Sequence, residues 1–311
     1  MTCIFACNGV KSNPIDIGEI DMAENFQDKI NLIYPTLSKG HKKIAEFIKT
    51  NYEKASFMTA ASLGKAVGVS ESTVVRFASN IGFEGYPELQ KYLQEMVKSH
   101  LTSVQRMDVA ASRYGDEDFI DRAFSADIEM IKATRDGISR EAFVKSAEAI
   151  NNARKIYILG VRSSAALASF AAFYFRFLYE NVVLIDTSAA SEVFEQMFRI
   201  GSEDVCIAIS FPRYSNQTVN ALSFAQSRGA TIISITDGEF SPIAPYATHL
   251  LVAKSNMVSF VDSLTAPLSV INALVAAAAK EKHDDVYNDF KALEEIWDEY
   301  HVYRTGEEGK E

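Results

Sequence analysis

Hydrophobic positions between residue 26 and about residue 100 recur at helical spacing. The segment HKKIAEFIKTNY puts Ile44, Phe47 and Ile48 on one face of a helix and lysines on the other. TAASLGKAV predicts a short second helix. The N-terminal part of the chain is therefore expected to be helical throughout.

A third helix is predicted within GVSESTVVRFASNIGFEGY, over about residues 71–81. Gly68 ends the preceding helix, Ser70 is a favourable N-cap residue, and Val74 and Phe77 fall on the inward face. Two helices joined by a short turn that contains glycine, the second opening on small polar residues, are typical of a helix-turn-helix. A plain three-helix bundle is the alternative.

The exposed face of the third helix favours DNA binding over that alternative. It carries Ser72, Thr73, Arg76 and Asn80 rather than the Glu and Lys pairs of an ordinary solvated helix. We expect the first three to reach base edges or phosphates, and an arginine can bind guanine through two hydrogen bonds. Side chains expected to contact the DNA backbone, unless they are ordinary solvated residues, are Lys42, Lys43, Lys65 and Tyr86.

The pattern changes after residue 152. Short apolar, β-rich runs now alternate with helical stretches, namely KIYILG, VVLID, DVCIAIS, ATIISIT and HLLVA. This alternation predicts a doubly wound α/β domain with a five-stranded parallel sheet covered on both faces. Amphipathic helices are expected just before it, over about 118–135 and 139–152. A last one, over 284–303, should pack on the body or on a second subunit.

Two domains are therefore predicted, an all-α helix-turn-helix bundle followed by the α/β domain. The expected division is a poorly ordered tail over 1–22, the bundle over 23–104, a linker over 105–125, the α/β domain over 126–283, and a C-terminal helix and tail over 284–311.

Charge is distributed unevenly between these parts. The formal net charge of the chain is −10, but residues 39–106 hold ten Lys or Arg and six Asp or Glu, which is +4 and leaves −14 for the remainder. A basic module is joined to an acidic body, and local charge matters more to a partner than the sum.

The three cysteines, Cys3, Cys7 and Cys206, give neither a disulfide framework nor a complete metal set. No apolar run is long enough to cross a bilayer, and no basic leader precedes the apolar opening. We expect a cytoplasmic protein without a metal, a cofactor or a membrane partner.

Candidate ligand chemistry lies where strands end. Ligands of open parallel sheets bind beyond the carboxyl ends of the strands, and three such ends here are rich in hydroxyls, in GVRSSAALA, SFPRYSNQT and TDGEFSP. Hydroxyls and free backbone N–H groups at helix starts favour a phosphate, and Arg162 or Arg213 could add charge. Helix capping alone would also explain each serine.

Two long stretches resemble a known family. LGKAVGVSESTVVRFASNIGFEGYPELQKYL is similar to the DNA-binding domain of RpiR-type (MurR/RpiR) bacterial transcription regulators. IYILGVRSSAALASF and the stretch from IAISFPRYSNQT to HLLVA resemble their sugar isomerase (SIS) domain. The resemblance implies a repressor or activator of carbohydrate metabolism, a homodimer or homotetramer that binds double-stranded operator DNA and responds to a sugar phosphate.

The resemblance also implies an effector site. It is expected at Ser163, Ser164, Glu192, Ser210, Arg213, Ser215 and Thr218, the glutamate facing sugar hydroxyls. Many SIS domains carry a tight Ser-x-Ser-Gly-x-Thr loop, whereas this chain has SFPRYSNQT, with Asn216 where the glycine would fall. Arg213 and Tyr214 are therefore expected to reshape the pocket or to face a subunit partner.

Two other functions stay open at this stage. A sugar-phosphate isomerase would use the same fold, with His249, His283 or Glu192 as base or acid, but an enzyme has no use for the basic helical module. A regulator whose ligand is not phosphorylated would also be consistent with the unusual loop, because a fold alone does not decide function.

Overall fold

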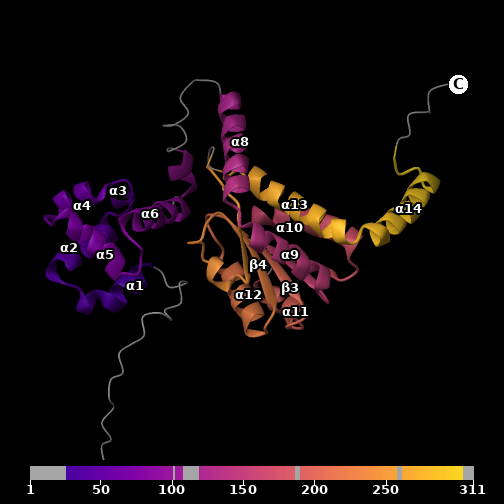
Figure 1. Cartoon of the computed structure of the whole chain (residues 1–311), viewed down its shortest axis with the longest axis horizontal. Helices are drawn as coiled ribbons and strands as arrows, with labels where there is room; N and C mark the ends of the chain where they lie inside the picture. The colour runs from indigo at the N-terminus through magenta and orange to yellow at the C-terminus, as the bar shows by residue number, and fades with distance from the viewer. Residues whose placement is uncertain (1–25, 101, 108–118, 186–189, 258–260, 304–311) are drawn as a thin grey trace, which may run out of the picture.

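The structure of the chain is a computed structural model that describes residues 26–100, 102–107, 119–185, 190–257 and 261–303. A helical bundle comes first and an α/β domain follows it (Figure 1). The tail predicted over 1–22 lies outside the described residues.

The bundle is helical throughout, as predicted. Its elements are α1 (Phe26–Ile33), the 3-10 helix η2 (Tyr34–Thr36), α2 (Lys39–Thr50), α3 (Tyr52–Ser56), α4 (Ala60–Val67), α5 (Glu71–Asn80) and α6 (Tyr86–His100). They enclose one core, in which Ile44, Leu63 and Phe77 are fully buried.

Local signals set the turn between α4 and α5. Gly68 has a φ of 74°, the left-handed conformation that ends α4. Ser70 then caps α5, because its Oγ accepts a hydrogen bond from the Thr73 backbone N–H at 3.3 Å. A Cβ on Gly64 would lie 2.9 Å from the Val69 carbonyl oxygen, so this turn packs tightly against α4. The predicted helix-turn-helix is confirmed in its geometry.

Two helices precede the sheet, α8 (Phe119–Gly137) and α9 (Arg140–Asn152). Between the bundle and α8, residues 103–107 are helical, and we call residues 102–107 the connector. The Arg106 side chain is 1% exposed, and its Nη1 lies 2.7 Å from Asp262 Oδ2. The domain boundaries remain predictions, although α8 begins inside the segment expected to be a linker.

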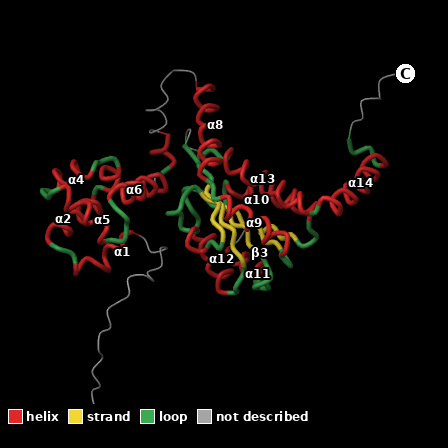
Figure 2. Tube along the Cα trace, viewed as in Figure 1, coloured by secondary structure: helices red, strands yellow, loops and turns green. Residues whose placement is uncertain are grey.

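The α/β domain has the predicted five-stranded parallel sheet, in the order β2-β1-β3-β4-β5. Its strands are β1 (Ile156–Gly160), β2 (Val182–Ile185), β3 (Val205–Ile209), β4 (Thr231–Thr236) and β5 (His249–Val252). Its further helices are α10 (Ser164–Leu178), α11 (Ala190–Met197), α12 (Asn216–Ser227), the 3-10 helix η3 (Ala244–Tyr246) and α13 (Thr265–Glu281). Figure 2 shows the strands between the helices.

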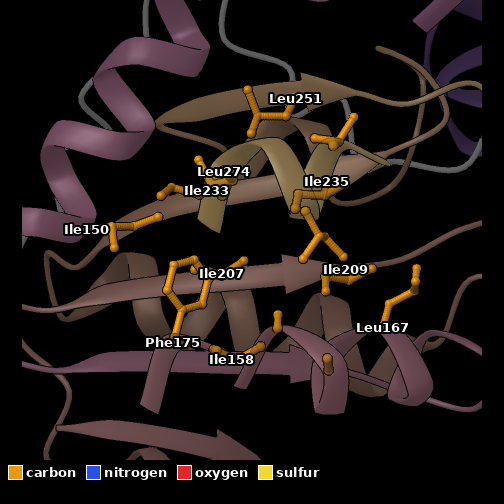
Figure 3. Packing of buried hydrophobic residues seen from close by; sticks show 14 of the residues in the cluster. Ile150, Ile158, Leu167, Phe175, Ile207, Ile209, Ile233, Ile235, Leu251 and Leu274 are labelled. Carbon is orange, nitrogen blue, oxygen red and sulfur yellow. The ribbon is translucent and has the colours of Figure 1, made fainter. Parts of the chain in front are cut away.

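Alternating side chains of the strands build two cores. Ile158 and Ile207 face one side, where they pack with residues of α9, α10 and α13, such as Ile150, Phe175 and Leu274 (Figure 3). The neighbouring residues of the same strands point to the opposite side, toward α11 and α12. Both faces of the sheet are therefore covered, which is why its strands are continuously apolar.

The last helix, α14 (His283–Glu299), extends away from the sheet (Figure 1). Phe290 stacks on Phe177 of α10 with ring centroids 5.5 Å apart. Farther along, Ile296 is 49% exposed and Tyr300, just after the helix, is 70% exposed. Within the described chain, this helix packs on the body through its first half and leaves Ile296 and Tyr300 exposed to solvent.

Candidate functional site

The sheet order places a topological switch point between β1 and β3, and we call the region beyond the carboxyl ends of these two strands the crevice. These strands are neighbours, and Gly160 and Ile209 pair at their carboxyl ends. The connection after β1 returns through α10 on one face of the sheet, whereas the connection after β3 returns through α12 on the other. Such a topological switch point is where open α/β sheets bind ligands, and it brings together the two predicted serine-rich loops.

The turn from β1 into α10 is built on a close backbone approach. A Cβ on Gly160 would lie 2.4 Å from the Ser164 carbonyl oxygen, so only glycine fits there. Arg162 follows with a φ of 58°, a left-handed conformation that is uncommon outside glycine. Ser163 is exposed at the N-cap of α10 and makes no side-chain capping bond, while Ser164 is buried. The Ser163 hydroxyl is therefore available to a ligand.

The loop from β3 into α12 carries the other predicted hydroxyls. Ser210 is buried, and Ser215 caps α12 by accepting a hydrogen bond from the Gln217 backbone N–H at 3.2 Å. Thr218 is 1% exposed, and its Oγ1 has no hydrogen-bond partner among the described residues. The Gln217 side-chain nitrogen is likewise buried without a partner there. Leaving a buried hydroxyl unpaired costs about 1 to 3 kcal/mol, which makes this loop a candidate ligand site.

Helix electrostatics also favour an anion at the crevice. Neither α10 nor α12 has an acidic residue in its first turn, so the positive ends of both helix dipoles are not neutralised by a carboxylate of their own first turns. By contrast, α11 has Glu192 in its first turn, where the side chain is half-buried. Glu192 lies on the helix that follows β2, the strand beside β1.

The structure gives Arg213 a different position from the one expected. Its backbone has a φ of 67°, and its exposed side chain donates a hydrogen bond from Nη1 to Ser103 Oγ of the connector at 2.7 Å. Arg213 is thus engaged with the connector rather than with the hydroxyls of the crevice. Its expected role as an effector ligand is therefore not supported by this geometry.

Tyr214 links two of the loops. Its hydroxyl donates a hydrogen bond to Asp237 Oδ1 at 2.6 Å, across from β3 to the end of β4. Burial raises the pKa of the Tyr214 phenol, and the nearby Asp237 charge raises it further. The tyrosine therefore stays protonated and able to donate.

The loop after β4, which the hydroxyl-rich TDGEFSP run predicted, lies beside a lysine that the sequence did not single out. Thr236 Oγ1 donates to Ser241 Oγ at 2.7 Å, and Lys254 Nζ lies 3.4 Å from the Asp237 carbonyl oxygen. The hydroxyl-rich TDGEFSP run signalled this loop, but Lys254 follows β5 and only the sheet order brings it close.

His249 lies away from the crevice. It is the first residue of β5 and pairs with Ile233, whereas the carboxyl end of the neighbouring strand is Thr236. Burial lowers the pKa of His249, and the charge of Lys145 lowers it further. His283 begins α14, after the 17 residues of α13 have run back from that end of the sheet. His249 is therefore not placed to serve as a base at the crevice.

The DNA-binding candidates on α5 are mostly exposed. Ser72 and Arg76 are exposed, whereas Thr73 is half-buried beside Gly40. The Ser70 hydroxyl lies 2.9 Å from the Ser72 hydroxyl and 2.8 Å from the Thr73 hydroxyl, so the three form a cap network. Val75, which the sequence pattern did not suggest, is 40% exposed on the same helix.

The lysine candidates lie around α2 and α4. Lys42 and Lys43 line a groove of about 760 Å³ together with Tyr34 and Val67, and Lys65 is exposed on α4. Lys42 Nζ lies 5.3 Å from the centre of the Tyr34 ring, a cation–π distance.

Tyr86 differs from this group. It is 4% exposed, its hydroxyl donates to the Met58 carbonyl oxygen at 2.7 Å, and burial raises its pKa to about 12. Because both its ring and its hydroxyl are used inside the bundle, Tyr86 has no surface to offer DNA, which corrects the expectation for this residue.

No cluster of three or more His, Cys, Asp or Glu suited to a metal ion occurs in the described part of the chain. None of the helices described is long and apolar enough to span a membrane.

Comparison with known proteins agrees with the two-domain geometry. The helix-turn-helix domain of the rpiR family matches residues 24–100, and the SIS domain matches residues 149–277. HexR, an HTH-type transcriptional regulator of Pseudomonas aeruginosa, is 28% identical over 232 residues, which are 73% of this chain and 78% of HexR. An HTH-type transcriptional regulator of Haemophilus influenzae is 26% identical over 231 residues, 73% of this chain and 79% of the relative.

Solved structures show the same fold. The sugar isomerase domain of an RpiR transcription factor from Sphaerobacter thermophilus is 27% identical, with a TM-score of 0.53 over 56% of this chain and 97% of that one. NanR of Vibrio vulnificus in complex with ManNAc-6P is 19% identical, with a TM-score of 0.56 over 90% of this chain and all of that one. The chain belongs to the RpiR family of HTH-type transcriptional regulators, with an N-terminal helix-turn-helix domain and a C-terminal SIS domain.

Proposed function

We propose that this regulator controls genes of carbohydrate metabolism and that a sugar phosphate, bound in the crevice between β1 and β3, sets its affinity for operator DNA. The observation that carries the proposal is the buried, unpartnered Thr218 hydroxyl beside the N-terminus of α12. NanR, which has the same fold, was solved with a phosphorylated sugar, and this supports the same class of ligand here.

The phosphate would occupy the start of α12. Ser210, Ser215 and Thr218 would donate hydroxyl hydrogen bonds, and the first backbone N–H groups of the helix would add the field of its dipole. Ser163 and Ser164, at the start of α10, would close the site from the β1 side. Because Arg213 is engaged with the connector, the positive charge would come mainly from the two helix ends.

The remainder of the ligand would lie toward β2. The half-buried Glu192 carboxylate would accept hydrogen bonds from sugar hydroxyls. A carboxylate that positions hydroxyls would discriminate between sugars, because a deoxy analogue would leave it unpaired.

On the DNA, α5 would enter the major groove. Arg76 would bind a guanine or a phosphate, Ser72 would reach a neighbouring base or phosphate, and Val75 would contact a thymine methyl group. Lys42, Lys43 and Lys65 would bind phosphates and position the helix without specifying sequence. A homodimer or homotetramer would present paired α5 helices to half-sites about one DNA turn apart.

We propose a binding role without catalysis for the SIS domain, in a cytoplasmic protein that needs no cofactor. Aldose–ketose interconversion requires a base near the sugar C1 and C2 protons. His249 lies at the amino-terminal end of β5, away from the carboxyl ends of the strands, and the Asp237 carboxylate already accepts a hydrogen bond from Tyr214. Turnover of the bound sugar phosphate in a colorimetric isomerase assay would contradict this proposal.

The experiment that tests the effector site is thermal unfolding of the protein with a panel of sugar phosphates and their unphosphorylated parents. A ligand at a hundred times its Kd stabilises by about 2.7 kcal/mol, which raises the melting temperature measurably. Ser210→Ala should remove the shift, whereas Ser223→Ala, an exposed serine farther along α12, should keep it. A panel without any shift would contradict the phosphate proposal.

A further inference from the structure

We infer that the segment Asp237–Ser241 is a docking surface for the chain's own helix-turn-helix domain and transmits the state of the effector crevice to α5. We call this segment the β4 loop. Its docking stands on contacts between the two domains, and only its link to an effector rests on the function proposed above.

Phe240 is the centre of the contact. Its ring lies 5.2 Å from the Tyr92 ring of α6 at an interplanar angle of 89°, and 6.2 Å from the Phe83 ring at 64°. Lys91 Nζ lies 5.8 Å from the Phe240 ring centre. Edge-to-face aromatic pairs and a cation over a ring are both specific, attractive geometries. A SIS-domain side chain thus packs against the core of the helical bundle.

At Gly238 the backbone of the β4 loop comes close to α6. A Cβ at this position would lie 3.1 Å from Glu95 Oε1 and 3.2 Å from Oε2 of α6. The absence of a side chain therefore lets the loop approach α6 without displacing the glutamate. The surface consists of an aromatic anchor with a close backbone contact two residues before it.

The same loop is tied to the effector crevice. The Tyr214 hydroxyl, from the loop between β3 and α12, donates to Asp237 at 2.6 Å, and Tyr214 directly precedes the capping Ser215. Arg213, one residue earlier, holds Ser103 of the connector at 2.7 Å. Any ligand that moves the start of α12 acts directly on residues that hold the bundle.

The bundle side of the contact leads to the DNA-reading helix. Phe83 follows α5 by three residues, and its backbone N–H donates to the Ala78 carbonyl of that helix at 3.1 Å. Phe83 is 8% exposed and belongs to the same core as Phe77 of α5. Movement of Phe240 would therefore shift the packing at the end of α5, while the exposed Arg76 face stays open to DNA.

An effector can bias this contact only through different affinities for the docked and undocked arrangements. The Tyr214–Asp237 hydrogen bond supplies such a difference. A phosphate bound at the start of α12 would shift the loop that contains Tyr214, and the β4 loop would shift with it through this hydrogen bond. The coupling would be reciprocal, so DNA bound to α5 would also change the affinity of the crevice for its ligand.

The test is hydrogen–deuterium exchange of the full chain without ligand, read in peptides that cover residues 83–96. Phe240→Ala should speed exchange there by a factor on the order of ten. Tyr214→Phe, which removes only the hydroxyl that holds Asp237, should speed it by on the order of threefold or more. Matched controls are Phe198→Ala and Tyr174→Phe, which alter exposed SIS aromatics and should leave these peptides unchanged.

The two proposals fail in different ways. If Phe240→Ala leaves the exchange of residues 83–96 at the wild-type rate, docking by the β4 loop is overturned. If Phe240→Ala speeds exchange but Tyr214→Phe does not, the link from the crevice is overturned. Neither reading uses an effector, so a sugar-phosphate panel without a melting shift would refute the proposed function and leave the docking surface standing.

Discussion

Replacing Thr218 by Val should stabilise the unliganded protein and weaken its effector at the same time. Valine has nearly the shape of threonine but places a methyl group where the hydroxyl was. Thr218 is 1% exposed and its Oγ1 lacks a partner among the described residues, so the substitution removes a buried unsatisfied group without opening a cavity.

The expected magnitudes follow from this burial. Relief of an unpaired buried hydroxyl is worth about 1 to 3 kcal/mol, which at about 2 to 4 °C per kcal/mol for a domain of this size raises the melting temperature by about 2 to 12 °C. Loss of one hydrogen bond to a charged phosphate costs about 1.5 to 3 kcal/mol of binding, so the Kd of the effector should rise by roughly 10- to 150-fold.

Differential scanning calorimetry with and without the sugar phosphate measures both effects on one sample. The wild type should gain about 2.7 kcal/mol at a hundred times its Kd, and the variant about 1.4 kcal/mol or less at that concentration. Thr265→Val, at the start of α13 where the hydroxyl donates to Asp127, is the control, since removal of a satisfied hydroxyl should destabilise. A Thr218→Val protein that is less stable and binds normally would refute the reasoning.

Three further predictions use other parts of the structure. Arg76→Ala should weaken operator binding about 10-fold or more in fluorescence anisotropy, with the melting temperature unchanged, since Arg76 is exposed; unchanged affinity would remove it from the interface. Gly160→Ala should destabilise the SIS domain by about 3 kcal/mol or more, because its Cβ would meet backbone at 2.4 Å, and a wild-type urea midpoint would contradict this. In a Cys3→Ser, Cys7→Ser variant, Cys206 should resist iodoacetamide at pH 8, since burial raises its pKa to about 12. The stability this neutral thiol contributes is complete below about pH 8.5 and falls as pH rises toward 12; rapid alkylation of the native protein would refute its burial.

The sequence predicted the parts of the fold that depend on local signals. Gly68 ends α4 and Ser70 begins α5 through the conformation and hydrogen bonds of the local backbone. Five apolar runs between helical stretches indicate a covered parallel sheet. The interdomain contact of Phe240 could not be predicted in this way, because its partners Phe83 and Tyr92 lie in another domain.

Two site predictions show the same limit. Arg213 was expected at the anion. Its left-handed backbone and its hydrogen bond to Ser103, 110 residues away, depend on the tertiary structure and leave no local signal in the sequence. Tyr86 was expected at the DNA, but its hydroxyl meets Met58, 28 residues away, inside the bundle. A polar tip on an aromatic ring gives no sign in the sequence of whether it will face solvent or a buried carbonyl.

The measurement that tests the account most directly is operator affinity with and without the sugar phosphate that raises the melting temperature. Operator fragments would be selected from genomic DNA with the purified protein and titrated by fluorescence anisotropy. The account predicts that the effector changes the Kd for DNA by about 5- to 150-fold, that the unphosphorylated sugar does not, and that Ser210→Ala abolishes the change while it still binds DNA. Equal DNA affinity with and without a ligand that demonstrably occupies the crevice would contradict it.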